Sequence, residues 1–425
     1  MTAVGGRPRT RAVVTGVGVV SAWGWGREPF WRGILGGGTA IRRFCRFDHA
    51  GYRTHVAGEV PPAPAALPGS IRDWSRLSWA DRFAVAAARE ALEQAGLLDG
   101  DGDCLEDAGL FFASSTGGML EGEEFYWRLR GAAPGRAALR LIATQPVSSP
   151  AEAVARALGL SGPVETVSSA CASGTISLGR ALDALRSGEV EVALAGGADS
   201  LCRTTYGGFN SLRSVDEVPC RPFLRERAGL SIGEGGAVLV VETAEHAAAR
   251  GARPLVELVG AGSTSDAGHM TAPHPEGEGA ARALAAALAD AAARPADVAF
   301  VNAHGTGTPL NDAAEGRALG AVLGDDAVRP LPVTSTKGAI GHLLGSAGAA
   351  EAAATVLSLV HGTVPPTAGS GELDADTGVD LVRERPRPLP AGVGVSLNLA
   401  FGGCNAALVF APVPGPRAAG APAAG

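Results

Sequence analysis

Short apolar runs rich in β-branched residues alternate along the chain with alanine-rich segments of helical period. In the first half, the pattern predicts strands at 11–20, 108–114, 164–169, 191–196 and 236–242, with helices near 79–96, 150–158 and 173–187. In the second half, it predicts strands at 254–261, 298–303, 331–335, 393–398 and 405–411, with helices near 278–293, 312–323 and 345–360. This alternation is typical of an α/β layered fold.

The two halves show the same order of elements, which is consistent with an internal duplication. We therefore expect one half at residues 1–253 and a second at 254–412. The segment 413–425 is rich in Pro, Ala and Gly, and it is predicted to be a disordered tail.

Composition narrows the class of protein. Hydrophobic residues make up 46% of the chain and charged ones 19%, so a sizeable core is expected. The formal charge of −7 argues against nucleic acid as a partner. No apolar stretch is long enough to span a bilayer, and the glycine-broken run 12–20 is predicted to be a buried strand rather than a signal peptide. Six scattered cysteines without a CxxC pair favour a reduced, cytoplasmic protein without a metal site.

Thirty-six residues are Lys or Arg, yet only Lys337 is a lysine. A lone lysine in such a chain indicates a place where a compact ammonium is required and a planar guanidinium does not fit. Chance is the alternative explanation.

Cys171 lies where the predicted strand 164–169 gives way to the helix 173–187. A thiol at a helix N-terminus is favoured as the thiolate by unpaired N–H groups and by the helix dipole. The small residues around it leave room for a group attached to sulfur. Taken alone, such a cysteine is more often a packed core residue.

Three further segments place polar side chains at strand or helix ends. His304 follows the strand 298–303, with Thr306 and Thr308 in the next turn, and strand ends are where open α/β sheets bind ligands. Lys337 and His342 lie in a Gly-rich loop before the helix 345–360. Glu351 is a single acid on that apolar helix, and a buried carboxylate needs a cationic neighbour such as Lys337.

Phe401, Gly402 and Gly403 separate two apolar segments near the end of the chain. Two consecutive glycines allow a sharply turned backbone that could offer an N–H group to a ligand. A simple β-turn beside a core phenylalanine is the alternative.

The ordered motifs CASGT, NAHGTGTP, TSTKGAIGH and AFGGCN resemble those of the β-ketoacyl-acyl carrier protein synthases, particularly the elongating, KAS II-like branch. The resemblance covers residues 10–411. It implies the thiolase fold, in which two duplicated α/β halves form a five-layered αβαβα arrangement that is normally dimeric. It also implies a decarboxylative Claisen condensation of an enzyme-bound acyl group with a malonyl thioester.

The resemblance further assigns roles to individual residues. It implies that Cys171 is the nucleophile, that His304 and His342 stabilise the enolate, and that Lys337 and Glu351 support them. It implies an oxyanion hole formed by the backbone N–H groups of Cys171 and Phe401. It also implies a gate at Phe401 and Gly402, with Asp266, His269 and Thr271 in an opposing gate loop. Thr306 and Thr308 resemble the pair that hydrogen-bonds phosphopantetheine, and Cys404 is interpreted as a small structural residue. No cofactor is bound, because the substrates travel on the phosphopantetheine arm of an acyl carrier protein.

The same resemblance predicts partners. Carrier proteins are acidic, so a basic docking rim is expected, and Arg72, Arg76, Arg136 and Arg213 fall where the family places its docking residues. An ordinary solvated surface is the alternative for each. The chain is expected to form a homodimer or a heterodimer with a chain-length factor.

Several positions depart from the usual family pattern. Leu399 replaces an aromatic residue, Ala400 a gate glycine, Gly268 a tyrosine and Ala228 an aspartate. These departures favour a specialised type II polyketide or polyene synthase, with a primary fatty-acid elongation enzyme as the alternative. A chain-length factor, which shares the fold but lacks the nucleophile, is disfavoured by Cys171 and both histidines.

Overall fold

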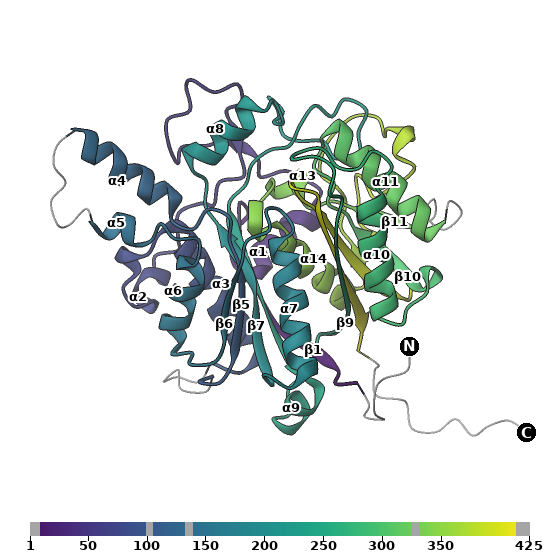
Figure 1. Cartoon of the computed structure of the whole chain (residues 1–425), viewed down its shortest axis with the longest axis horizontal. Helices are drawn as coiled ribbons and strands as arrows, with labels where there is room; N and C mark the ends of the chain where they lie inside the picture. Colours follow the sequence, from purple (N-terminus) through teal and green to yellow (C-terminus); the bar gives the residue numbers. More distant parts are fainter. Residues whose placement is uncertain (1–8, 99–104, 132–138, 325–330, 414–425) are drawn as a thin grey trace, which may run out of the picture.

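The computed structural model describes residues 9–98, 105–131, 139–324 and 331–413 (Figure 1). Every strand and helix predicted from the sequence is present, with ends that differ by a few residues. The predicted tail lies outside the described residues from position 414 onward. None of the described helices is long and apolar enough to cross a membrane.

The first half of the chain builds five neighbouring strands of the main sheet. They are β1 (Ala12–Ser21), β5 (Gly109–Ala113), β6 (Val164–Val167), β7 (Val192–Asp199) and β8 (Gly235–Thr243). Their spatial order is β1-β8-β7-β5-β6, in which β8 runs antiparallel to both of its neighbours and the other pairs are parallel. The edge strand β6 has no further partner among the described strands.

The second half repeats this topology. Its strands are β9 (Val256–Ser265), β10 (Val298–Asn302), β11 (Pro332–Thr334), β13 (Asp380–Leu381), β15 (Val393–Leu399) and β16 (Cys404–Pro412). The order β9-β16-β15-β10-β11 matches β1-β8-β7-β5-β6 strand by strand, including the antiparallel second strand, and β13 is added at the edge. The predicted duplication is therefore visible in the topology, whereas a boundary at residue 253 stays a prediction.

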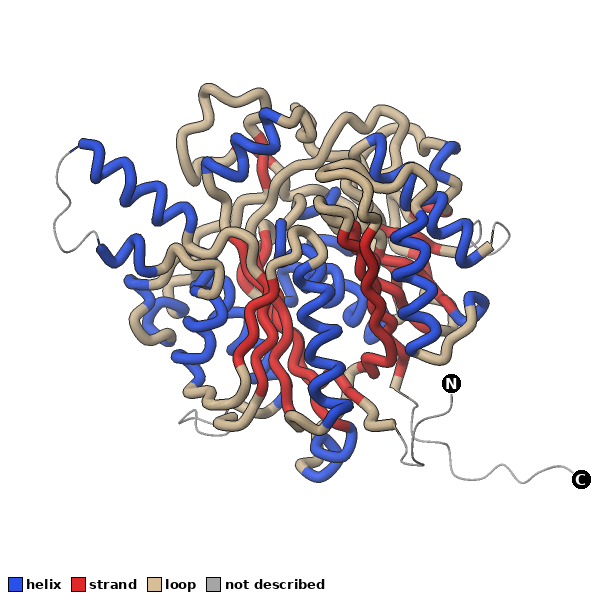
Figure 2. The backbone as a smooth tube through the Cα atoms, in the orientation of Figure 1, coloured by secondary structure: helices blue, strands red, loops and turns tan. Residues whose placement is uncertain are grey.

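Helices complete five layers. The central layer consists of α7 (Ser173–Ser187) and α14 (Ala347–His361), which contact each other and strands of both halves (Figure 1). One outer layer is α3 (Trp79–Ala95) with α6 (Ser149–Leu158), and the other is α10 (Glu278–Asp290) with α11 (Pro309–Leu323). Figure 2 shows the two groups of strands on either side of the central helices. This is the αβαβα arrangement of the thiolase fold.

Glycines in the first strand of each half let an outer helix approach closely. A Cβ atom at Gly16 would lie 1.9 Å from the carbonyl oxygen of Ala91 in α3. In the second half, a Cβ atom at Gly262 would lie 2.3 Å from the carbonyl oxygen of Ala283 in α10. The same packing solution therefore recurs in both halves.

The two half-sheets are joined by hydrogen bonds between β1 and β9. Only Ala12–Val14 and Val256–Leu258 take part in this pairing. The strands of both halves consequently form one continuous sheet that turns around the central helices.

The remaining elements are short or lie over the ends of the sheet. The helices are α1 (Arg27–Leu35), α2 (Leu67–Ser70), α4 (Met119–Gly131), α5 (Leu139–Ala143), α8 (Arg203–Ser211), α9 (Ala244–Ala249) and α13 (Lys337–Ile340). The short strands are β2 (Gly24–Trp25), β3 (Arg42–Arg43), β4 (Val56–Ala57), β12 (Thr363–Val364) and β14 (Arg387–Pro388). Loops gather at the upper end of the molecule in Figure 2, together with α8 and α13.

Candidate active site

Cys171 lies in the turn between β6 and α7. Ala170, directly before it, has a left-handed backbone with φ of 47°, and the helix begins at Ser173. The hydroxyl group of Ser173 donates to the carbonyl oxygen of Ala170 and accepts from the N–H of Ser169. These bonds hold the sharp turn, and the Cys171 side chain is buried within it.

His304 follows the end of β10. Its backbone N–H and that of Gly305 donate to the two carboxylate oxygens of Glu315, at 2.6 and 2.7 Å. Glu315 belongs to α11 and is fully buried. Its two hydrogen bonds therefore tie the backbone at His304 to that helix.

His342 lies between α13 and α14. Its Nδ1 accepts the backbone N–H of Leu344 at 3.0 Å. An imidazole nitrogen that accepts a hydrogen bond carries no proton, so the proton of neutral His342 is on Nε2.

The three side chains converge. The Cys171 Sγ and one ring nitrogen each from His304 and His342 all lie within 4.8 Å of one another. The two rings are nearly perpendicular, with centroids 5.3 Å apart. The three residues come from motifs spread over residues 171–342 and nevertheless form a single cluster.

Lys337 is 1% exposed, and all three of its N–H donors are used. Its Nζ donates to the His304 Nδ1 at 3.0 Å, to the His304 carbonyl oxygen at 2.6 Å and to the Glu351 carboxylate. The expected pairing of Glu351 with Lys337 is present. Because Nδ1 of His304 also accepts, its proton too lies on Nε2.

Burial dominates the acid–base properties of the cluster. Burial, and then the charge of Lys337, hold the pKa of His304 and of His342 well below the usual histidine value, so both rings are neutral. Burial raises the pKa of Cys171 to about 11, and the Lys337 charge and the backbone N–H groups of Phe401 and Cys171 offset only part of that rise. The backbone N–H groups act in the expected direction, toward the thiolate, but desolvation outweighs them.

The same cluster has the residue types of a zinc site. A metal-binding imidazole offers one nitrogen as a lone pair and donates the N–H of the other to an acceptor. Here the hydrogen bonds run in the opposite sense, since each Nδ1 accepts and each Nε2 keeps its proton. The arrangement suits donation to an oxyanion rather than metal binding.

A cavity of about 340 Å³ leads to the cluster. Among the residues predicted from the sequence, those that line it are Cys171, Arg213, Thr271, His304, Thr306, Thr308, His342 and Phe401. The hydroxyl groups of Thr306 and Thr308 are 2.9 Å apart. Of the departures from the family pattern, Ala228, Leu399 and Ala400 line the cavity, whereas Gly268 does not.

The remaining predicted gate residues lie beside the cavity and connect two loops. The N–H of Gly402 donates to the carbonyl oxygen of Met270 at 2.7 Å, and the N–H of Asp266 donates to the carbonyl oxygen of Gly403 at 2.8 Å. His269 accepts through Nδ1 the N–H of Thr271 within its own loop. The two predicted gate loops are therefore hydrogen-bonded to each other.

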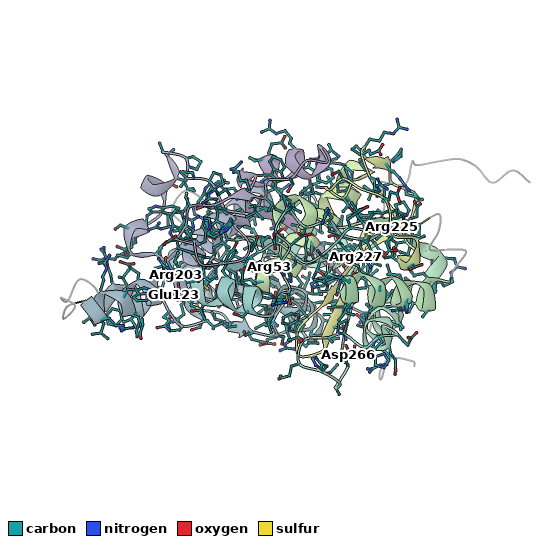
Figure 3. The ribbon with its side chains drawn as sticks, turned by 90° about the horizontal axis from the view of Figure 1, so that it is seen from above. Arg53, Glu123, Arg203, Arg225, Arg227 and Asp266 are labelled. Carbon is teal, nitrogen blue, oxygen red and sulfur yellow. The ribbon has the colours of Figure 1, made fainter. Side chains whose placement is uncertain are left out.

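The predicted docking arginines divide into two groups. Arg213 lines the cavity mouth, but Arg72 and Arg76 do not line it and lie within ion-pair distance of Asp73. Arg136 lies outside the described residues. Seen from above in Figure 3, Arg53 lies between the pair formed by Arg203 and Glu123 and the neighbouring Arg225 and Arg227. These four arginines were not predicted as docking residues.

Cys404 lies away from the cluster. It begins β16, pairs in register with Ser265 of β9, and does not line the cavity. This position agrees with its interpretation as a small structural residue.

Three buried polar residues of the site were missed in the sequence. Asn398 donates to Glu351 and to His304, Glu315 holds the His304 backbone, and Asp199 accepts N–H groups from Thr116 and from Ser346. Asn398 offered a signal, because it is a single amide within the apolar strand 393–398. Glu315 and Asp199 gave no sequence signal that distinguishes them from acidic residues on the surface.

Comparisons with known proteins identify the family. Residues 9–247 match the model "Beta-ketoacyl synthase, N-terminal domain", and residues 255–370 match "Beta-ketoacyl synthase, C-terminal domain". The chain is 36% identical over 406 residues to the 3-oxoacyl-acyl-carrier-protein synthase 2 of Staphylococcus aureus (strain N315), covering 94% of this chain and 98% of that protein.

Comparison with solved structures identifies the same family. A chain of the ishigamide ketosynthase/chain length factor has a TM-score of 0.89 and 34% identity, covering 96% of this chain and all of that one. A chain of a type II polyketide acyl-carrier protein in complex with its ketosynthase has a TM-score of 0.86 and 29% identity, covering 96% and 100%. The chain belongs to the β-ketoacyl synthase family of condensing acyltransferases.

Proposed function

We propose that the chain uses Cys171 to accept an acyl group from an acyl carrier protein and then condenses that group with a malonyl thioester. The observation that carries the proposal is the convergence of one thiol and two imidazoles on one cavity. Both imidazoles are neutral and both present an Nε2–H group.

The first step exchanges one thioester for another. The Cys171 sulfur attacks the acyl carbonyl carbon, the carrier's thiol leaves, and the proton lost by Cys171 is taken up by that thiol. The backbone N–H groups of Cys171 and Phe401, which both lower the pKa of the thiol, are close enough to the sulfur to serve as the oxyanion hole.

In the second step, the malonyl thioester loses CO2 and becomes an enolate. The Nε2–H groups of His304 and His342 donate to its thioester oxygen, where the negative charge develops. The enolate carbon then attacks the acyl group on Cys171. The bond between the acyl carbon and the Cys171 sulfur breaks, the β-ketoacyl thioester leaves on the carrier, and the Cys171 thiolate takes a proton from water.

Other residues have supporting roles in this proposal. Lys337, itself paired with Glu351, orients His304 through the hydrogen bond to Nδ1. Thr306 and Thr308 bind the phosphopantetheine arm on the cavity wall. Phe401 and Gly402, with the loop of Asp266, His269 and Thr271, form the gate.

The proposed partners are an acyl carrier protein and a second chain of the same fold. One relative was solved with its acyl-carrier protein and another as a ketosynthase/chain length factor, which supports both partners. Arg213 at the cavity mouth suits an acidic carrier. The open edge of β6 and the exposed Tyr126 and Trp127 of α4 suit a homodimer or a heterodimer.

We place the reaction in type II polyketide or polyene biosynthesis, because three of the four departures from the usual pattern line the cavity. Fatty-acid elongation is the second candidate, favoured by the 36% identity to the 3-oxoacyl synthase. A cytoplasmic location is supported by the free thiols of Cys45, Cys171, Cys202, Cys220 and Cys404.

Intact mass spectrometry tests the proposal. The protein is incubated with carrier proteins that bear saturated or polyenoyl chains, alongside the Cys171→Ala and His304→Ala variants. We expect one acyl adduct on the wild type, none on Cys171→Ala, and an adduct without condensed product on His304→Ala. An acyl adduct on Cys171→Ala would overturn the mechanism, and loading of short saturated chains alone would overturn the polyene assignment.

A further inference from the structure

Asn398 occupies the centre of the polar network beside His304, and the proposed mechanism leaves it without a role. It lies near the end of β15 and is completely buried. Its Nδ2 donates to the Glu351 carboxylate at 2.6 Å and to the His304 Nδ1 at 3.1 Å. Its Oδ1 accepts the hydroxyl group of Thr175 at 2.5 Å.

The neighbours of Asn398 allow only one orientation of its amide. With the amide reversed, its oxygen would face the Glu351 carboxylate, and two acceptors would be in contact without a proton between them. The Thr175 hydroxyl, whose residue is 1% exposed, reinforces the observed orientation because it donates to the amide oxygen.

The packing around this hydrogen bond is close. A Cβ atom at Gly348 of α14 would lie 2.2 Å from the Thr175 hydroxyl oxygen and 3.0 Å from the Asn398 Oδ1. Any side chain at position 348 would displace one of the two groups. The two central helices and β15 are therefore tightly packed against one another at Thr175, Asn398 and Gly348.

The position of Thr175 gives this contact a consequence for the reaction. Thr175 is on α7, one helical turn after Cys171. The hydrogen bonds thus run from the nucleophile's helix through Asn398 to the ring of His304. Lys337 also donates to that ring nitrogen, but it divides its three donors among three acceptors.

We propose that Asn398, oriented by Thr175, is a positioning residue that holds His304 with its Nε2–H directed at the developing enolate. This inference rests on the proposed function. Asn398 then sets the orientation of the His304 Nε2–H group relative to α7, the helix that follows the acyl-carrying Cys171. The acyl-transfer step, which uses the backbone N–H groups of Cys171 and Phe401, does not depend on it.

The experiment separates the two half-reactions in the full-length protein. Acyl loading of Cys171 is measured by intact mass with an acetyl-loaded carrier protein, and condensation is measured with a malonyl-loaded carrier protein. Thr175→Val removes the hydroxyl group at nearly constant volume, Thr175→Ser restores it, and Asn398→Leu removes the amide. Thermal melting checks that each variant folds.

We expect acyl loading to stay within about twofold of the wild type in all three variants. The kcat of condensation should fall roughly tenfold in Thr175→Val and roughly 10- to 100-fold in Asn398→Leu, as expected for lost hydrogen bonds to a charged network. Thr175→Ser should condense like the wild type. In protein labelled with ¹⁵N-histidine, the Nδ1 signal of His304 should shift in Asn398→Leu, because Lys337 is then the remaining donor to that nitrogen.

The outcomes distinguish this inference from the proposed function. If the wild type itself fails to load or condense, the proposed function is wrong. If the wild type is active and the folded Thr175→Val and Asn398→Leu variants condense at its rate, Asn398 is not a positioning residue. Equal losses in loading and condensation, or an unchanged His304 signal, would also overturn the inference.

Discussion

The segment 168–172 joins β6 to α7 in the first half, and the segment 335–346 joins β11 to α14 in the second. The two connections occupy equivalent places in the repeated topology and meet at one cavity. The first supplies Cys171, whose neighbours along the chain are small and uncharged. The second supplies Lys337 and His342, and it lies against Glu351 and His304.

The difference shows how one scaffold serves two kinds of chemistry. Around Cys171, burial keeps the thiol protonated. The small neighbouring residues and the cavity leave space for an acyl group. Around Lys337, burial is tolerated only because every polar atom of the lysine has a partner. The repeated topology places the two connections at equivalent positions. In the proposed function, one connection holds the acyl group and the other helps to stabilise the enolate.

The largest effect should come from removing the charge in the second connection. Lys337→Met leaves the Glu351 carboxylate buried without its cation, which should lower the free energy of unfolding by about 3–5 kcal/mol. It also releases the His304 ring, so condensation should fall about 10²- to 10³-fold. Urea unfolding and a condensation assay measure the two effects.

The double variant Lys337→Met/Glu351→Gln is the matched control. It should recover part of the lost stability, because no unpaired charge remains, yet it should not recover condensation. Wild-type condensation in either variant would mean that the second connection does not act through Lys337.

The next largest effect is a pH dependence of the reactivity of Cys171 in the first connection. Because burial raises the pKa of Cys171 to about 11, only about 10⁻⁴ of the thiol is ionised at pH 7. Alkylation of Cys171 by iodoacetamide should therefore accelerate about tenfold for each pH unit between pH 7 and 10. Peptide mass spectrometry separates this site from the exposed Cys45. A rate that levels off by pH 8 would show that the connection stabilises the thiolate after all.

The smallest effect is a pH dependence of stability in the second half. Burial raises the pKa of Glu315 from 4.5 to about 8, so the folded protein holds a proton that the unfolded chain has lost. Stability from this group is complete below pH 4.5 and is lost as the pH rises toward 8, by about 1.4 kcal/mol per pH unit. Urea unfolding at pH 5.5 and 7.5 should show the wild type losing stability relative to Glu315→Gln. A constant difference between the two proteins would contradict this assignment.

Much of this architecture could be predicted from the sequence. Periodicity was sufficient for the central and outer-layer helices and for most strands of the main sheet, whereas α1, α4 and β13 were not predicted. The convergence of Cys171, His304, His342 and Lys337 could be expected because each lies at the end of a strand or the start of a helix, and the fold brings those ends together.

The sequence did not predict what depends on three-dimensional packing. Helix position alone favoured the thiolate of Cys171, whereas the burial that raises its pKa exists only in the folded chain. Asn398 gave no indication of its partners, which come from α7, α14 and the end of β10. Arg72, Arg76 and Arg213 were grouped as docking residues by resemblance to the family. Of these three, Arg213 lines the cavity, and the docking role of all three stays a prediction.

The short pairing between β1 and β9 has a consequence for biosynthesis. During synthesis, the β9 residues Val256–Leu258 follow their β1 partners by more than 240 residues. At roughly 5–20 residues per second, the nascent first half waits on the order of tens of seconds with that edge unpaired. An unpaired strand edge is a site for non-native association, so the emerging chain should depend on chaperones until its second half appears.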